Sequence, residues 1–318
     1  MDILNKIQAE PPKILVFGDI MLDRFIFGNV NRISPEAPVP VVCAINEKSS
    51  LGGCGNVLRN LINLGVKASI VSVVGQDLPG EKIKHQLHKK GVSTNSLIQL
   101  GSIRTTEKMR IVAEGQQVVR VDWDANNLTD QKLNKVLKQI IEEITNVDGI
   151  IISDYDKGIC TELVIKNIIS KAKALKMPVF VDPKGKDWNK YSGAFIITPN
   201  LKEAEELIGR ELITDEDVET AGKEICEDLS LNACLITRGS NGMSYIGKDI
   251  RFHVSSEARE IYDVSGAGDT VIASFAAGIL VGVDSETVTR FANKAAGIVV
   301  GHIGTTAITI PELKEVSN

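Results

Sequence analysis

Four apolar runs between residues 148 and 239 decide the fold: DGIIISD (148–154), MPVFVDP (177–183), GAFIITPN (193–200) and NACLITRG (232–239). Each run is rich in β-branched residues and almost free of polar interruptions, which is typical of strands covered on both faces. Two similar runs lie earlier in the chain, KILVFGD (13–19) and VKASIVSVVG (66–75).

Between these runs lie amphipathic stretches that fit crossover helices: 56–64, 161–175, 201–208 and 218–229. The alternation predicts an α/β protein with a doubly wound, mainly parallel central sheet and helices on both faces. Ligands of such sheets bind beyond the carboxyl ends of the strands, where we expect Asp19, Asp154, Asp182, Asn200 and Arg238.

Two segments interrupt the alternation. Residues 25–47 contain three prolines within 34–40 and then VPVVCAI, and residues 102–124 contain two strand-like runs around Glu114 and Gly115. We expect them to form a small β lid on a main domain of residues 1–24, 48–101 and 125–318. A purely structural appendage or a dimer clasp would give the same pattern. Lid and clasp are compatible, and we expect a homodimer formed through the β lid.

The composition limits the classes of function. The chain has 318 residues, 24% of them charged, with a formal net charge of −5. This balance gives no sign of a surface for nucleic acid or anionic membranes, so we expect small-molecule partners. The five cysteines are scattered, and the first residues do not resemble a signal peptide, which favours the cytoplasm.

The motif DVSGAGDT (263–270) precedes a long apolar stretch and suits phosphoryl transfer. The backbone N–H groups of Gly266, Ala267 and Gly268 would lie at the start of a helix, where anions bind well. Asp269 follows them and could take a proton from a hydroxyl beside a phosphate. A capped helix after a tight turn is the alternative reading.

Four landmarks resemble the ribokinase-like carbohydrate kinase family: GGCGN (52–56), PNLKEAEELIG (199–209), TRGSNG (237–242) and SGAGD (265–269). The resemblance covers nearly the whole chain and implies a ribokinase-like fold, with Asp269 as general base and Gly266 to Gly268 as anion hole. Three segments are similar to those of the family branch that phosphorylates glycero-manno-heptose 7-phosphate: residues 18–42, the run KMRIVAEGQQVVRVDWD and the run SDYDKG.

The resemblance also implies the residues that bind the nucleotide. Asn200 and Glu203 match the family's NxxE motif, whose carboxylate organises hydrated Mg²⁺ through water. Thr237, Arg238 and Gly239 match contacts to the nucleotide phosphates, and Asn293 matches the region beside the adenine. A capping box between Asn200 and Glu203 is the competing interpretation.

Residues after the first strand and in the glycine motif are matched to the sugar: Asp19, Asp23, Gly52, Gly53 and Asn56. A turn residue at Asp19 and a helix N-cap at Asn56 are alternatives. The family's ribokinase branch has a lysine where this chain has Cys54. A substrate that already bears a phosphate needs cations, for which we consider Lys108, Arg110, Arg120, Lys157 and Lys184, with Lys108, Arg120 and Lys157 retained as site residues.

The sequence therefore predicts an ATP- and Mg²⁺-dependent kinase of the anomeric hydroxyl of D-glycero-D-manno-heptose 7-phosphate. A requirement for a monovalent cation stays open. The first alternative is another sugar kinase of this fold, such as a ribokinase, fructokinase or phosphofructokinase. The second is a non-catalytic sugar- or nucleotide-binding regulator, and the third is a structural oligomer built through the β segments.

Overall fold

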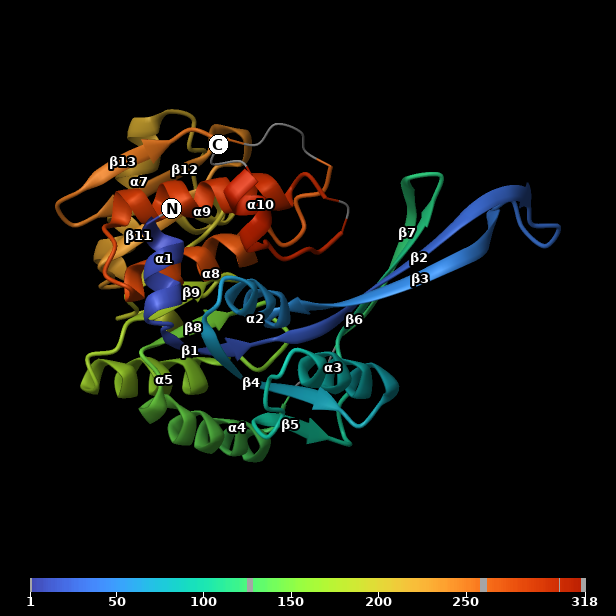
Figure 1. Cartoon of the computed structure of the whole chain (residues 1–318), viewed down its shortest axis with the longest axis horizontal. Helices are drawn as coiled ribbons and strands as arrows, with labels where there is room; N and C mark the ends of the chain where they lie inside the picture. The colour runs from blue at the N-terminus through green and yellow to red at the C-terminus, as the bar shows by residue number, and fades with distance from the viewer. Residues whose placement is uncertain (1, 125–127, 258–261, 303, 316–318) are drawn as a thin grey trace.

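A computed structural model describes residues 2–124, 128–257, 262–302 and 304–315. Within these ranges a nine-stranded sheet has the order β13-β12-β11-β10-β9-β8-β1-β4-β5 (Figure 1). The strands from β11 to β5 are parallel, and β12 and β13 extend one edge as an antiparallel hairpin. The bounds are β1 Lys13–Gly18, β4 Lys67–Gly75, β5 Leu97–Leu100, β8 Gly149–Ser153, β9 Val179–Asp182, β10 Ile196–Ile197, β11 Ala233–Thr237, β12 Met243–Gly247 and β13 Arg251–Val254.

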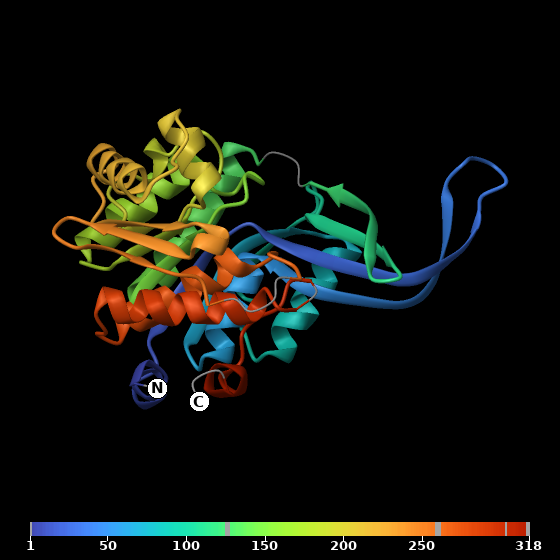
Figure 2. The ribbon, with the colours of Figure 1, turned by 90° about the horizontal axis from the view of Figure 1, so that it is seen from above.

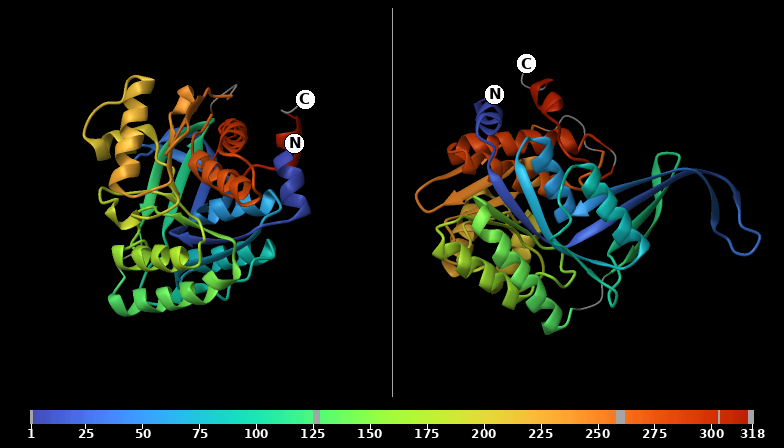
Figure 3. Two further views of the ribbon diagram at one scale, coloured as in Figure 1. Left: turned by 90° about the vertical axis from the view of Figure 1, so that its left-hand side faces the viewer. Right: turned by 60° about the horizontal axis from the view of Figure 1, so that its bottom comes forward.

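Helices cover both faces of this sheet, as Figures 1 and 3 show. The first face carries α1 (Asp2–Ala9), α2 (Cys54–Asn63), α3 (Leu78–Lys89), α8 (Ala267–Leu280), α9 (Ser285–Val299) and α10 (Ile310–Glu315). The opposite face carries α4 (Asp130–Glu143), α5 (Glu162–Ala174), α6 (Leu201–Ile208) and α7 (Asp215–Asp228).

Strand β1 shows why the sheet needs two layers. Its side chains alternate between the two hydrophobic cores, with Ile14 and Val16 in one and Leu15 and Phe17 in the other. All four are fully buried, which explains the continuous apolar run in the sequence. The predicted doubly wound, mainly parallel sheet is confirmed.

A second sheet of four strands has the order β3-β2-β6-β7. Its strands are β2 (Ile20–Ile33), β3 (Pro40–Gly53), β6 (Glu107–Ala113) and β7 (Gln116–Trp123). The β2–β3 hairpin extends far from the main body as an arm (Figure 2). The sheet includes residues 20–24 and 48–53 in addition to the two segments expected for the lid, because both hairpin strands continue into the main body.

Over the described ranges, no helix combines the length and the apolar character that a bilayer crossing requires.

Candidate active site

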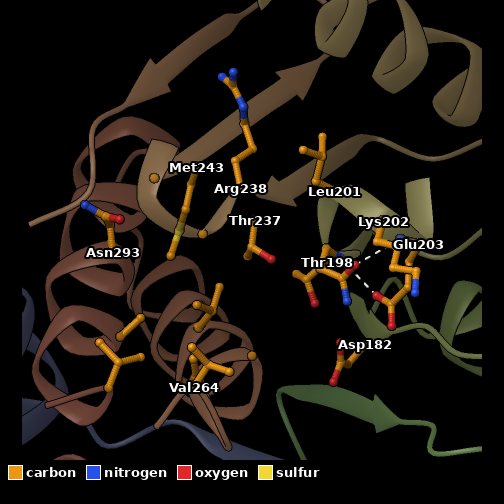
Figure 4. A pocket seen from close by; sticks show the side chains of 18 of the residues that line it. Asp182, Thr198, Leu201, Lys202, Glu203, Thr237, Arg238, Met243, Val264 and Asn293 are labelled. Carbon is orange, nitrogen blue, oxygen red and sulfur yellow. Dashed lines mark hydrogen bonds between the residues drawn. The ribbon is translucent and has the colours of Figure 1, made fainter. Parts of the chain in front are cut away.

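A cleft of about 520 Å³ opens at the carboxyl ends of the parallel strands (Figure 4). Strands β9 and β11, helix α6 and the first turn of α8 contribute to its walls. Except for Gly266, the residues that the sequence assigned to the nucleotide and its phosphates line this one cleft: Asn200, Glu203, Thr237, Arg238, Gly239, Ala267, Gly268 and Asn293.

Asp269 lies in the first turn of α8, directly after the cleft residue Gly268, and its side chain is buried. Its Oδ2 accepts a hydrogen bond from Asn56 Nδ2 at 2.9 Å, and its Oδ1 accepts one from the Tyr155 hydroxyl at 2.9 Å. Burial raises the pKa of the Asp269 carboxyl to about 6, although both hydrogen bonds lower it. A carboxylate with this pKa is charged near neutral pH and can still accept a proton.

The glycine turn before Asp269 has the backbone shape that the motif requires. Gly266 has φ 86°, and a Cβ there would lie 2.7 Å from Asn56 Nδ2. A Cβ on Gly268 would meet no atom within 4 Å, so the space beside its backbone is open to a ligand. The N–H of Ala267 donates to the Val264 carbonyl at 3.2 Å, so the turn uses one of the three expected anion-hole donors internally.

The NxxE motif forms a capping box, which the sequence offered as the alternative to a role in Mg²⁺ binding. Asn200 Oδ1 accepts from the Glu203 N–H at 2.9 Å, and Glu203 Oε2 accepts from the Asn200 N–H at 3.0 Å. Glu203 still lines the cleft, and its Oε1 accepts from Lys184 Nζ at 2.6 Å. The capping box therefore holds the carboxylate in a fixed position at the cleft wall.

Asp182 at the end of β9 faces the same part of the cleft as Glu203 (Figure 4). Burial, together with the charges of Asp269 and Glu203, raises the pKa of Asp182 well above its usual value. A divalent cation would relieve this concentration of negative charge, and Mg²⁺ prefers oxygen ligands and retains waters. The residues present therefore fit a hydrated Mg²⁺ ion beside Glu203 and Asp182.

Thr237 is the last residue of β11 and Arg238 follows it, and Asn293 lies opposite them on α9 (Figure 4). The Arg238 side chain extends away from Thr237, and its Nη1 contacts Asp215 Oδ1 at 2.6 Å and Ser244 Oγ at 3.1 Å. The Arg238 guanidinium thus fixes β11 to neighbouring elements, and a phosphate contact through it would require a different rotamer. Asn293 Nδ2 donates to the Ser255 carbonyl at 2.8 Å.

Asp23 on β2 is buried, and its charge raises the pKa of Asp269. Its Oδ1 accepts from Arg110 Nη1 at 2.8 Å, and its Oδ2 accepts from the Thr305 hydroxyl at 3.0 Å. Gly52 is required beside it, because a Cβ there would lie 2.2 Å from the Asp23 carboxylate. The glycine motif therefore lets β3 approach the carboxylate that the sequence assigned to the sugar.

Asp19 accepts hydrogen bonds from several backbone N–H groups, which the sequence did not reveal. Its Oδ2 accepts from the N–H groups of Tyr155 at 2.9 Å and Lys157 at 3.2 Å, while its main-chain carbonyl accepts from Cys54 N–H at 3.1 Å. The main chain of Gly53 lies against that carbonyl as well. Asp19 therefore anchors the loop after β8.

The three cations assigned to the substrate phosphate have different surroundings. Lys108 Nζ lies 5.6 Å from the centroid of the Tyr155 ring, and burial lowers its pKa. Lys157 Nζ contacts Asp124 Oδ1 at 2.8 Å, and Arg120 is exposed and contacts Asp122 at 2.9 Å. Of these three cations, Lys108 is the one that lies over the ring of Tyr155, whose hydroxyl contacts Asp269.

Sequence reasoning missed two residues that contact the expected site. Tyr155 was not singled out within SDYDKG, although its hydroxyl binds Asp269. Arg59 was also overlooked; its Nη1 donates to Asn56 Oδ1 at 3.1 Å and to the Thr305 carbonyl at 3.2 Å. The spacing of Arg59, three residues after Asn56 on one helix, was the available signal.

Solved structures identify the class of this fold. Escherichia coli phosphofructokinase-2 in complex with potassium matches with a TM-score of 0.82 at 19% identity, covering 96% of this chain and 98% of that chain. Arabidopsis thaliana ribokinase complexed with ribose and ATP matches with a TM-score of 0.73 at 21% identity, with the same two coverages. The fold is ribokinase-like, as predicted.

Sequence comparison then gives the family. The model described as "pfkB family carbohydrate kinase" matches residues 11–313. The chain therefore belongs to the pfkB family of carbohydrate kinases.

Two curated relatives carry the name "Bifunctional protein HldE". The protein of a Nitratiruptor species is 41% identical over 308 residues, and that of Geotalea uraniireducens is 40% identical over 308 residues. Each alignment covers 96% of this chain but only 64% and 63% of the respective relative. The chain thus spans a little under two thirds of the relatives that it matches.

Proposed function

We propose that this kinase transfers the γ-phosphoryl group of ATP to the anomeric hydroxyl of D-glycero-D-manno-heptose 7-phosphate. The product would be the 1,7-bisphosphate, which can serve the synthesis of nucleotide-activated heptose. The observation that carries the proposal is the buried Asp269 carboxylate, which directly follows the cleft residue Gly268 and accepts a hydrogen bond from Tyr155, the residue whose ring lies beside Lys108 of β6. The resemblance of residues 18–42 and of SDYDKG to heptose-phosphate kinases supports this choice of sugar, as do the relatives named HldE.

The proposed reaction uses the chain's own groups as follows. The sugar C1 hydroxyl gives its proton to Asp269 while its oxygen forms a bond to the γ-phosphorus, and the bond to the bridging oxygen of ADP breaks. Backbone N–H groups at the N-terminus of α8 stabilise the negative charge on the transferred phosphoryl group, which can approach closely because the space beside Gly268 is open. When bound beside Glu203 and Asp182, Mg²⁺ neutralises the charge of the nucleotide phosphates.

The four-stranded sheet takes two roles in this proposal. As a lid it excludes water from the reacting groups, which protects ATP from hydrolysis. As a clasp it joins two copies of the chain, and the exposed side chains Ile33 and Ile45 on the arm, 61% and 73% accessible, would be covered in that dimer. We place the reaction in the cytoplasm, where ATP is available.

A substrate panel with coupled detection of ADP tests the proposal. We would compare D-glycero-D-manno-heptose 7-phosphate with the unphosphorylated heptose, fructose 6-phosphate, fructose and ribose, each with and without added K⁺. The heptose phosphate should give the highest kcat/KM, and ³¹P NMR should show a new anomeric phosphate. A clear preference for ribose or fructose 6-phosphate would replace the proposed substrate by another sugar, while ATP binding without turnover of any sugar would favour a regulator.

A further inference from the structure

The SDYDKG segment (153–158), which follows β8, has a tightly fixed backbone. The Asp19 carboxylate accepts hydrogen bonds from the backbone N–H groups of Tyr155 and Lys157, and a longer one of 3.4 Å from the N–H of Ile159. Asp156 has the positive φ of 56°, a conformation that is uncommon outside glycine. These contacts hold the backbone on both sides of Asp156 in place, including that of Tyr155.

The Tyr155 side chain connects two parts of the molecule. Its hydroxyl donates to Asp269 Oδ1 at 2.9 Å, and the Lys108 ammonium group on β6 lies 5.6 Å from its ring centroid. Strand β6 belongs to the four-stranded sheet, whereas Asp269 belongs to α8 of the main body. Tyr155 is thus in contact with the lid on one side and with the carboxylate on the other.

We infer that Tyr155 is a positioning residue that holds the Asp269 carboxylate ready for the acceptor hydroxyl and connects this carboxylate to the lid strand β6. The inference rests on the proposed role of Asp269 as general base. With Asn56 on Oδ2 and Tyr155 on Oδ1, rotation of the carboxylate is prevented. Each carboxylate oxygen has a second lone pair, so the acceptor hydroxyl can bind without loss of either contact.

The Tyr155 hydroxyl also favours the charged form of the base. Its hydrogen bond lowers the pKa of Asp269, while burial of that carboxyl raises it. Burial raises the pKa of Tyr155 itself well above its usual value, so it stays a proton donor throughout the working range. Other charged groups that act on Asp269 include Asp23, which raises its pKa, and Arg59, which lowers it, and the charge of Asp269 in turn raises the pKa of Asp182.

The test is the pH profile of kcat/KM for the Tyr155→Phe variant of the full chain. Without the hydroxyl, the pKa of Asp269 should rise, so the acidic limb of the profile should move to higher pH by roughly 0.5–1 unit. At about pH 5, below the pKa of about 6 for Asp269, the variant should be roughly 3- to 10-fold slower than the wild type, and this deficit should shrink above pH 8.5. The ratio of rates at the two pH values is independent of the fraction of folded enzyme.

Tyr245→Phe is the matched control, because it removes a hydroxyl from β12, outside the active site, where the ring stacks on Phe252. Its profile should equal that of the wild type. A Tyr155→Phe profile with an unmoved acidic limb, whether or not the rate falls uniformly, would overturn the inference. Full activity of Asp269→Asn in the same assays would instead refute the proposed base, so the two failures are distinguishable.

Discussion

The Asn56 side-chain amide donates to Asp269 Oδ2 at 2.9 Å, across 213 positions of sequence. The contact joins the first turn of α2 to the first turn of α8, and these two helices pack side by side on one face of the main sheet. A second bond between the same helices, from the Thr270 hydroxyl to Asn60 Oδ1 at 3.1 Å, fixes their relative position. The GGCGN motif (52–56) and the SGAGD motif (265–269) are therefore held together by the packing of α2 and α8.

Replacement of Asp269 by Asn should abolish turnover and leave the fold intact. Asparagine has the same shape but cannot accept the proton of the acceptor, so kcat should fall by about 10²- to 10⁴-fold. ATP affinity should change little, because Asp269 is not one of the residues that line the nucleotide cleft. Stopped assays of ADP formation and calorimetric titration with a non-hydrolysable ATP analogue measure the two quantities. A variant with near wild-type kcat would remove Asp269 from the mechanism.

Much of the fold could be predicted from the sequence, because strands of a parallel sheet that is covered on both faces give long apolar runs. Helix α1 escaped prediction: its sequence DILNKIQA is short and half polar, yet Ile3, Leu4 and Ile7 are buried against the main body. Their spacing of one and three residues fits a helix face, but eight residues carry too little signal against the neighbouring prolines.

The residues of the candidate site could be predicted from the sequence where a motif has a single role. Asn200 and Glu203 show the limit, because the capping box and the cleft position coexist and the sequence alone treats them as alternatives. The contact between Tyr155 and Asp269 spans 114 positions and arises only when β8 and α8 come together. The role of Asp19 as an anchor was hidden for the same reason.

The two glycines of the turn should respond differently to substitution by alanine. Gly268→Ala places a methyl group in the open space beside the cleft without a clash, so stability should be unchanged or higher by up to about 1 kcal/mol. The KM for ATP should nevertheless rise about 10-fold or more, because the methyl group blocks close approach of a phosphate. Thermal unfolding and initial-rate kinetics would show this separation of stability from activity.

Gly266→Ala is the matched comparison. Its positive φ disfavours any Cβ, and the methyl group would press on the Asn56 amide, so unfolding should become easier by about 1–2 kcal/mol. The displaced amide should also lower kcat through Asp269. Equal melting temperatures for the two variants would contradict this account of the turn.

Glu203→Gln should separate the two roles of the NxxE motif. Glutamine can keep the capping box, so the melting temperature should fall by no more than a few degrees. The lost negative charge should raise the Mg²⁺ concentration for half-maximal activity several-fold, since oxygen ligands hold this ion largely through charge. Glu206→Gln on the same helix is the control, because Glu206 is exposed and contacts only Lys202 among the ion pairs of the described residues. Identical Mg²⁺ titrations for both variants would exclude Glu203 from the metal site.

Lys108 and Arg120 lie on neighbouring strands of the four-stranded sheet, β6 and β7, and allow a direct comparison of the proposed phosphate contacts. Lys108→Met should raise the KM for the sugar phosphate about 10-fold or more, because a hydrogen bond to a charged group contributes roughly 1.5–3 kcal/mol. Arg120→Met should change it by less than about threefold, since Arg120 is half exposed and already contacts Asp122. The KM for ATP should stay constant in both variants, which distinguishes a lost phosphate contact from a disturbed fold. A larger effect at Arg120 would place the substrate phosphate over β7, further from Tyr155 than the position of Lys108 indicates.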